Sequence, residues 1–393
     1  MRLALLLAIL IPTTAGAREM PRLSAFDEKP VELPPLLKVP PASQPPANGP
    51  RGPDGEYDPG YFYLPERAPD RPRPTPCGPE GRIWIGPGLE LAWMKPADAP
   101  PLLRDGNAAG PVAYGGQSIS SPMQAGLSLA AGLWMNEART MGWDASFLYL
   151  NGTGSNSLVG PTADTVLVLP VGGVAAVTLA DPATGRLGAF QAGLDTLFAT
   201  ADVNYRNNLF CSPDSRLDAL VGYRYGRLSD DYEVYGKRLN PAGEIIRFRD
   251  EAHTQNHFHG GQIGLAGEWR AGRWFATGTG KVAFGVVFSE ATLEGKFRQD
   301  LVVVPFGLYS RPGLSGTQER SQFAVMPAAG FSVGRQIGDH GRVSLGYQLL
   351  YMNRVARGPE LMEPALTPAV AATEPATEGF WVQSFSLSAE WRY

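Results

Sequence analysis

Ten stretches of the chain between residue 82 and the C-terminus alternate between apolar and polar side chains. In the last of them, FSLSAEWRY, one phase is apolar and consists of Phe385, Leu387, Ala389, Trp391 and Tyr393. Successive side chains of a β-strand point to opposite faces, so each stretch predicts a strand with one apolar and one polar face. The other nine stretches are RIWIGPGLELAWM, AGLSLAAGLWM, MGWDASFLY, LFATADVNYR, RLDALVGYRY, HGGQIGLAGEWR, WFATGTGKVAFGVVF, FAVMPAAGFSVG and RVSLGYQLLYM.

The connections between these stretches alternate between short and long. Short turns are expected at Asn136–Thr140, Asn207–Ser215, Ala271–Arg273 and Gly338–Gly341. Long connections are expected at Lys95–Ser121, Asn151–Thr196, Ser229–Gln255, Glu290–Ser321 and Ala356–Gly379. This order predicts an antiparallel up-and-down meander of ten strands, with the turns and both termini at one end. Twelve strands is the alternative, if Thr165–Ala180 forms an additional hairpin.

The positions of the aromatic residues indicate which face of the strands is outside. A soluble barrel also alternates, with its apolar face inward. Here the aromatic residues of the apolar phase gather at both strand ends, and aliphatic residues fill the middle. At the turn end they are Trp143, Tyr205, Trp269, Trp274, Trp391 and Tyr393, and at the loop end Trp93, Tyr149, Tyr225, Tyr351 and Trp381. Two aromatic belts around an aliphatic band predict a transmembrane β-barrel with its apolar face toward lipid.

The polar phase predicts a hydrated interior with charges of both signs. The residues expected to line the lumen are Glu90, Asp144, Asp202, Arg206, Asp218, Arg224, Glu268, Lys281, Arg342, Glu390 and Arg392. Eight strands leave an interior that side chains fill, whereas open aqueous pores need about sixteen. A ten-stranded lumen is therefore expected to be narrow or plugged.

The start of the chain predicts export and a separate linker. Arg2, the apolar run Leu3–Ile11 and the small residues Ala15–Ala17 form a cleavable signal peptide over residues 1–17. Residues 18–81 hold 17 of the 36 prolines, which predicts a disordered periplasmic linker. The barrel is expected over residues 82–393, in the bacterial outer membrane.

Composition and motifs argue against several classes of function. The net charge of −4 is not accompanied by a basic block, so no nucleic-acid partner is expected. The stretch ATGTGKV around Lys281 lacks a phosphate loop's spacing and lies within a predicted strand. Loop residues His253, His257 and His259 lack a clear third metal ligand, and Asp230 and Asp231 beside them leave a surface protease open only as an alternative. We therefore predict no enzyme, no cofactor and no metal.

Only two cysteines occur, Cys77 and Cys211. Cys77 precedes the first strand and Cys211 lies in a turn at the same end, in an oxidising compartment. A Cys77–Cys211 disulfide and two unpaired thiols both stay open.

Several motifs resemble known outer-membrane proteins. The alternating end of the chain is similar to the C-terminal signal of bacterial barrels, which implies that the barrel assembly machinery recognises Phe385, Leu387, Ala389, Trp391 and Tyr393. RLDALVGYRYGRL, FAVMPAAGFSVG and LGYQLLYMNRVARGP resemble β-barrel porin family seven, and the resemblance covers most of residues 82–393. It implies a porin that passes small solutes by passive diffusion. The alternative is a non-conducting structural or adhesive barrel, linked to the cell wall through the Pro-rich linker and held in outer-membrane lipid.

Overall fold

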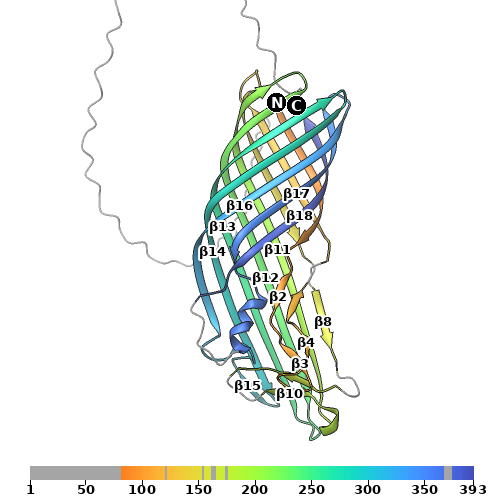
Figure 1. The fold of residues 1–393 in the computed structure, drawn as a ribbon, viewed down its shortest axis with the longest axis vertical. Helices are drawn as coiled ribbons and strands as arrows, with labels where there is room; N and C mark the ends of the chain where they lie inside the picture. Colours follow the sequence, from red (N-terminus) through yellow and green to blue (C-terminus); the bar gives the residue numbers. More distant parts are fainter. Residues whose placement is uncertain (1–80, 120–121, 153–154, 161–164, 173–175, 367–373) are drawn as a thin grey trace, which may run out of the picture. The chain divides into compact units, whose positions relative to one another are not determined.

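Ten antiparallel strands form a closed barrel (Figure 1). The computed structural model describes residues 81–119, 122–152, 155–160, 165–172, 176–366 and 374–393, all within one compact unit of the chain. The signal peptide and nearly all of the linker expected before the barrel lie outside the described residues. The barrel strands are β1 (Ile83–Met94), β6 (Gln124–Trp134), β7 (Met141–Asn151), β11 (Leu187–Cys211), β12 (Ser215–Leu239), β13 (Ile245–Ala271), β14 (Trp274–Gln299), β16 (Gly316–Ile337), β17 (Gly341–Val355) and β18 (Glu378–Arg392).

Strand β18 closes the ring by pairing with β17 on one side and β1 on the other. Leu387 lies opposite Leu345 in β17 and opposite Leu89 in β1. At the turn end, the Tyr393 N–H donates to the Ile83 carbonyl at 2.8 Å. Closure leaves no unpaired edge in the barrel, which is what strands need in hydrocarbon. Within the described residues, no helix is long and apolar enough to cross a membrane.

The alternative of twelve barrel strands is not what the chain adopts. Of Thr165–Ala180, the described residues form the short strands β9 (Leu167–Leu169) and β10 (Val177–Ala180). These belong to a separate small sheet with β3 (Leu103–Asp105) and β4 (Val112–Tyr114). The prediction of ten strands is confirmed.

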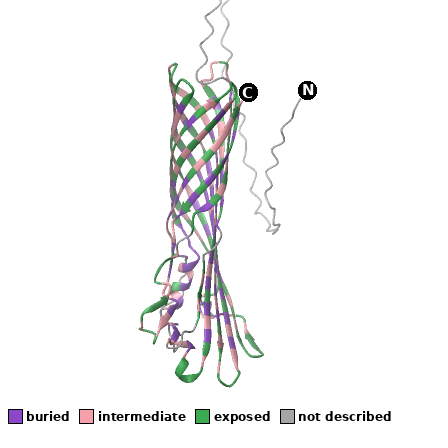
Figure 2. Ribbon diagram, turned by 90° about the vertical axis from the view of Figure 1, so that its right-hand side faces the viewer, coloured by how far each residue is buried: buried purple, intermediate pink, exposed green. Residues whose placement is uncertain are grey.

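The outer face of the barrel near the turn end is apolar and exposed, as predicted. Leu345 is 67% exposed there, while the inward-facing Asp218 is fully buried. Figure 2 shows the alternation of exposed and buried positions along these strands. The exposed aromatic residues include Trp143, Trp269, Trp274 and Trp391 at the turn end and Trp93 and Tyr351 at the loop end. A soluble barrel would bury this face, so the strands face lipid outside and polar side chains inside.

Strands β11 to β14 are much longer than predicted. Three of the predicted long connections are partly strand: β12 and β13 continue through most of Ser229–Gln255, β14 runs on to Gln299, and β11 begins at Leu187. A transmembrane strand needs only about 9–11 residues, and these strands have 25 to 27. They therefore extend well beyond the membrane at the loop end.

The missed extension has a physical cause, because the polarity of the two faces inverts along the strand. Near the turn end of β12, the outward Val221 is apolar and the inward Asp218 is charged. Further along, the outward Glu233 is charged and the inward Tyr232 and Val234 are buried. At this level the outer face of the strand passes from lipid into water. The inner face passes from the hydrated interior to a core of packed apolar side chains. The pattern expected of a membrane strand ends where the membrane ends, although the strand continues.

A small structure, here called the cap, covers the inner face of the extended strands. It consists of β2 to β5, β9, β10, the 3-10 helix η2 (Pro359–Leu366) and residues 305–315, with β2 (Ala97–Ala99) paired to β5 (Gln117–Ile119). Its Leu102, Leu169 and Met362 share one buried core with Phe190 and Phe248 of the barrel strands. The remaining elements are β8 (Ser155–Val159) on β11, β15 (Val302–Val304) on β14, and η1 (Pro182–Thr184).

The carboxylate of Asp250 in β13 fastens the cap to the barrel. It accepts hydrogen bonds from the backbone N–H groups of Leu308, Tyr309 and Ser310 at 2.8 to 3.1 Å, and from the Ser310 hydroxyl at 2.6 Å. The Tyr309 hydroxyl in turn donates to the Leu102 carbonyl at 2.7 Å. Asp250 is fully buried, and burial raises its pKa.

Candidate functional site in the barrel interior

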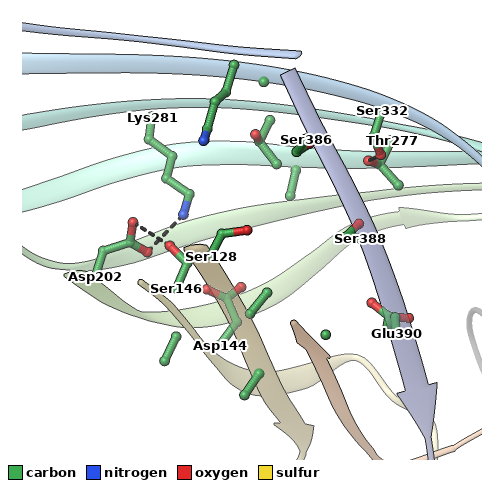
Figure 3. A pocket seen from close by; sticks show the side chains of 18 of the residues that line it. Ser128, Asp144, Ser146, Asp202, Thr277, Lys281, Ser332, Ser386, Ser388 and Glu390 are labelled. Carbon is green, nitrogen blue, oxygen red and sulfur yellow. Dashed lines mark hydrogen bonds and ion pairs between the residues drawn. The ribbon is translucent and has the colours of Figure 1, made fainter. Parts of the chain in front are cut away.

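The transmembrane part of the barrel encloses a cavity of about 390 Å³, here called the chamber (Figure 3). The structure places all eleven sequence-predicted lumen residues on its wall: Glu90, Asp144, Asp202, Arg206, Asp218, Arg224, Glu268, Lys281, Arg342, Glu390 and Arg392. They come from β1, β7, β11 to β14, β17 and β18, so strand closure brings together residues far apart in sequence.

Asp202 is the centre of the first ionic cluster. Its carboxylate accepts from Lys281 Nζ at 2.9 Å and from Arg224 Nη2 at 2.9 Å, and the Ser146 hydroxyl donates to it at 2.9 Å. The lysine within ATGTGKV is thus an ion-pair partner on a strand. Two cations share one carboxylate here.

Asp218 and Glu268 organise two further clusters nearer the turn end. Asp218 pairs with Arg206 Nη2 at 3.0 Å and with Arg216 Nε at 2.7 Å. Glu268 accepts two parallel hydrogen bonds from Arg342, both at 3.1 Å, and lies 4.0 Å from Arg392. Bidentate arginine–carboxylate pairs fix geometry as well as charge.

An aromatic layer stacked with arginines forms the turn-end floor of the chamber. The rings of Trp84 and Trp134 lie 5.1 Å apart. The guanidinium of Arg216 lies 3.8 Å from the Trp134 ring centroid, and that of Arg342 lies 4.5 Å from the ring of Phe275. Sequence reasoning missed these inward-facing aromatic residues and Arg216, although their strand phase is the one that carries the predicted lumen charges.

The opposite end of the chamber is closed by a group of buried apolar side chains, here called the apolar layer. Its largest members are Phe198, Phe258, Phe380, Met326 and Met352, all fully buried. The rings of Phe198 and Phe380 lie 5.5 Å apart. The remaining members are Ala92, Met94, Leu148, Leu150, Leu228, Ala283, Val287, Ala324, Leu350, Val355 and Val382. They come from all around the barrel except β6, so side chains fill the interior at this level.

A buried ion pair lies on the loop-end side of the apolar layer. Arg357 Nε donates to Asp230 Oδ2 at 2.5 Å, and the Thr196 hydroxyl donates to Asp230 Oδ1 at 2.8 Å. The Arg357 guanidinium also lies 5.3 Å from the ring centroid of Phe380. This pair joins β12 to the segment that leads into η2.

The histidines near the loop end contact neighbouring tyrosine and aspartate side chains. The described residues hold no group of three His, Cys, Asp or Glu side chains that could bind a metal ion. His257 and His259 contact Tyr225 and Tyr223 through Nδ1 at 2.8 and 2.6 Å. Asp231 pairs with His253 on the outer face, whereas Asp230 is fully buried inside. Of the two aspartates considered for a surface protease, only Asp231 therefore lies beside a histidine on the outer face.

The remaining predicted residues lie at the turn end or on β18. Cys211 ends β11, and Cys77 lies outside the described residues, so their pairing stays a prediction. Phe385, Leu387 and Trp391 are exposed on the outer face of β18, and Tyr393 is exposed directly after it. Recognition of this strand by an assembly machinery also stays a prediction.

Comparison with known proteins agrees with this architecture. Residues 102–393 match the family described as "Putative beta barrel porin-7 (BBP7)". No curated protein matches the sequence.

Several solved structures show a weak likeness. The outer membrane protease OmpT of Escherichia coli has a TM-score of 0.44 at 12% identity, covering 81% of this chain and 98% of its own. The toluene transporter TodX of Pseudomonas putida has a TM-score of 0.27 at 11% identity, covering 80% and 91%. A FadL homologue of Pseudomonas aeruginosa has a TM-score of 0.21 at 9% identity, covering 80% and 90%. Such low scores carry no argument about function.

Proposed function

This chain belongs to the beta barrel porin-7 family, and we propose that it is a sealed outer-membrane barrel that presents its extended strands and cap at the cell surface. The observation that supports this most is the apolar layer, in which Phe198, Phe258 and Phe380 are fully buried across the barrel interior. A hydrated solute would have to lose its water shell to pass these side chains.

The strand number supports the same proposal. Ten strands enclose little more space than the eight-stranded barrels whose interiors side chains fill. The chamber lies below the apolar layer, and the cap packs against the strands above it. Neither adds a path through the layer.

The extended strands suit a surface role. From Gly226 to Leu239, β12 continues for about 45 Å at roughly 3.3 Å per residue. Its outer face there carries charged residues such as Glu233 and Lys237. The proposal is a structural or adhesive barrel without catalytic activity, and the separation of Asp230 from Asp231 by the barrel wall supports that absence.

Passive diffusion of small solutes is the second candidate. The chamber favours it, because its wall carries charges of both signs and is large enough for a small molecule. Passage would require the apolar layer to rearrange, and Met326 and Met352 are its most adaptable members.

The proposal includes how the chain reaches and stays in the membrane. Residues 1–17 serve as a cleaved signal peptide, the assembly machinery recognises β18, and residues 18–81 connect the barrel to the cell wall. The exposed apolar face of β18 supports the second of these steps.

Planar-bilayer conductance tests whether the apolar layer prevents ions from passing through the barrel. The purified chain is expected to be silent, and a Phe258→Ala/Phe380→Ala variant is expected to conduct, since it removes two rings from the layer. The matched control is Phe284→Ala/Phe331→Ala, which removes two exposed rings from the outer face. Heat-modifiable gel migration verifies that each barrel is folded. Regular conductance steps from the unaltered chain would favour diffusion instead.

A further inference from the structure

The partly exposed charged residues of the chamber wall lie toward its turn end, beside the aromatic floor. Toward that end, the side chains of Glu390 and Arg206 on its wall keep 26% and 20% exposure. Toward the loop end, the apolar layer is buried throughout. In an outer-membrane barrel the short turns face the periplasm, so a solute entering from that compartment would not have to cross the apolar layer.

The chamber has two chemically different walls (Figure 3). One wall, from β7, β11, β12 and β14, carries the Asp202 cluster and its neighbours. Across from it lie the small hydroxyl side chains of Thr277, Ser332, Ser386 and Ser388, beside the carboxylate of Glu390. The Thr277 and Ser332 hydroxyls already contact each other at 2.7 Å. Hydroxyl groups both donate and accept hydrogen bonds, so this wall suits a ligand that carries hydroxyls of its own.

On the ionic wall, the guanidinium of Arg224 has two nitrogen donors that Asp202 does not use. Arg224 is 3% exposed, and its Nη2 donates to Asp202, but its buried Nε and Nη1 have no hydrogen-bond partner among the described residues. Buried N–H groups of a guanidinium are best satisfied by an anion. The arginine therefore offers a site for a carboxylate.

The local charge also favours an anion. The wall as a whole carries six cationic and six acidic side chains among the described residues. Around Arg224 the balance differs, because Arg224 and Lys281 both pair with the single carboxylate of Asp202. Asn204 links Asp202 to a second carboxylate, Asp144, which pairs with Arg206 at 3.3 Å. In this part of the wall Arg206, Arg224 and Lys281 therefore face Asp144 and Asp202.

We propose that the chamber is a periplasm-facing binding site for a small hydroxylated carboxylate, with Arg224 holding the carboxylate and the serine and threonine wall holding the hydroxyls. The volume of about 390 Å³ is within the range of small-molecule sites. This inference goes beyond the proposed function. Binding in the chamber does not require that the apolar layer blocks conductance, and a conductance measurement tests the apolar layer without testing binding in the chamber.

Cysteine accessibility in the full-length chain tests the site. Ser386→Cys places a thiol on the hydroxyl wall, in a background with Cys77→Ser and Cys211→Ser. The folded protein is reacted with methanethiosulfonate reagents of similar size, one bearing a sulfonate and one a trimethylammonium group. The sulfonate reagent is expected to react faster by about tenfold. Gluconate is expected to slow the reaction, and the neutral polyol sorbitol is not.

The residue assignment is tested with a matched pair of variants. Arg224→Gln is expected to abolish both the charge preference and the protection by gluconate, whereas Arg342→Gln on the floor of the chamber leaves both in place. Heat-modifiable migration identifies folded protein in each case. Equal rates for the two reagents, absence of any reaction of the Ser386→Cys thiol, or an unchanged preference in Arg224→Gln would each overturn the proposal.

Discussion

Asp230 and Asp231 are neighbours in sequence and lie on opposite sides of the barrel wall. Asp230 is fully buried and accepts from Arg357 at 2.5 Å, while the Asp231 side chain is 65% exposed and pairs with His253. Because successive strand side chains point to opposite faces, one carboxylate forms a buried ion pair with Arg357, here called the internal brace. The other forms an ion pair with His253 at the surface.

Removing the internal brace should cost far more than removing a surface pair. Arg357→Met leaves the Asp230 carboxylate buried and uncompensated, and breaking such a pair costs about 3–5 kcal/mol. Arg249→Met is the control, because Arg249 is 53% exposed and pairs with Glu233 at 2.8 Å. Exposed pairs contribute about 0–1 kcal/mol. Urea unfolding in lipid vesicles measures both, and similar losses would contradict the assignment of the brace.

A positive charge introduced on the lipid face should lower the free energy of unfolding more than the same charge introduced in the chamber. Leu345→Arg places a guanidinium against hydrocarbon, at about 2–4 kcal/mol near the bilayer midplane. Ser344→Arg, one residue earlier, directs the same group into the chamber, where Ser344 now contacts Ser388 at 2.8 Å. The free energy of unfolding should fall much further for Leu345→Arg. The reverse order would mean that the two faces are wrongly assigned.

The attachment of η2 should weaken as the pH rises toward neutrality. Burial, and then the nearby Glu378 carboxylate, raise the pKa of Glu360 from 4.5 to about 7, while Arg357 and Lys95 oppose the shift and Asp98 adds to it. Because the folded pKa lies above the unfolded one, this stabilisation is full below about pH 4.5 and is lost as the pH rises through about 7.

Hydrogen exchange of η2 between pH 4.5 and 8, corrected for intrinsic rates, measures this effect. Glu360→Gln should remove most of the pH dependence, whereas Glu363→Gln, an exposed residue of the same helix, should not. Protection that rises with pH in the unaltered chain would contradict the assignment.

The cap should detach without loss of the barrel when its anchor is removed. Asp250→Ala takes away the acceptor for three backbone N–H groups and the Ser310 hydroxyl, at about 1.5–3 kcal/mol for each hydrogen bond to a charged group. Limited proteolysis should then cut within residues 305–315, while heat-modifiable migration persists. Asp231→Ala, on the outer face, should leave the segment protected.

Much of the transmembrane part could be predicted from sequence, because lipid outside and polar side chains inside impose a period of two on every strand. That period located ten strands and eleven wall residues. It could not show the apolar layer, since there both faces are apolar. Runs such as FLYL at 147–150 and LLYM at 349–352 carry the signal, with Leu150 and Met352 inside the layer and Tyr149 and Tyr351 on the lipid side.

The cap and the strand extensions were missed for a different reason. Their packing depends on contacts such as Asp250 with residues 308–310, which are far apart in sequence and follow no period. Glycine- and proline-rich composition predicted loops there. The outward charges of β12 and β13 also hid the apolar inner positions Tyr232 and Phe248 from a search for lipid-facing strands.

All of these conclusions require that the exposed apolar face meets lipid, and tryptophan fluorescence in vesicles with brominated acyl chains measures this directly. Trp134 and Trp143 lie at the same depth on adjacent strands, at 6% and 44% exposure. In single-tryptophan variants, shallow bromines should quench Trp143 strongly and spare Trp134. Equal quenching of the two, or stronger quenching of Trp134, would contradict the orientation of the barrel.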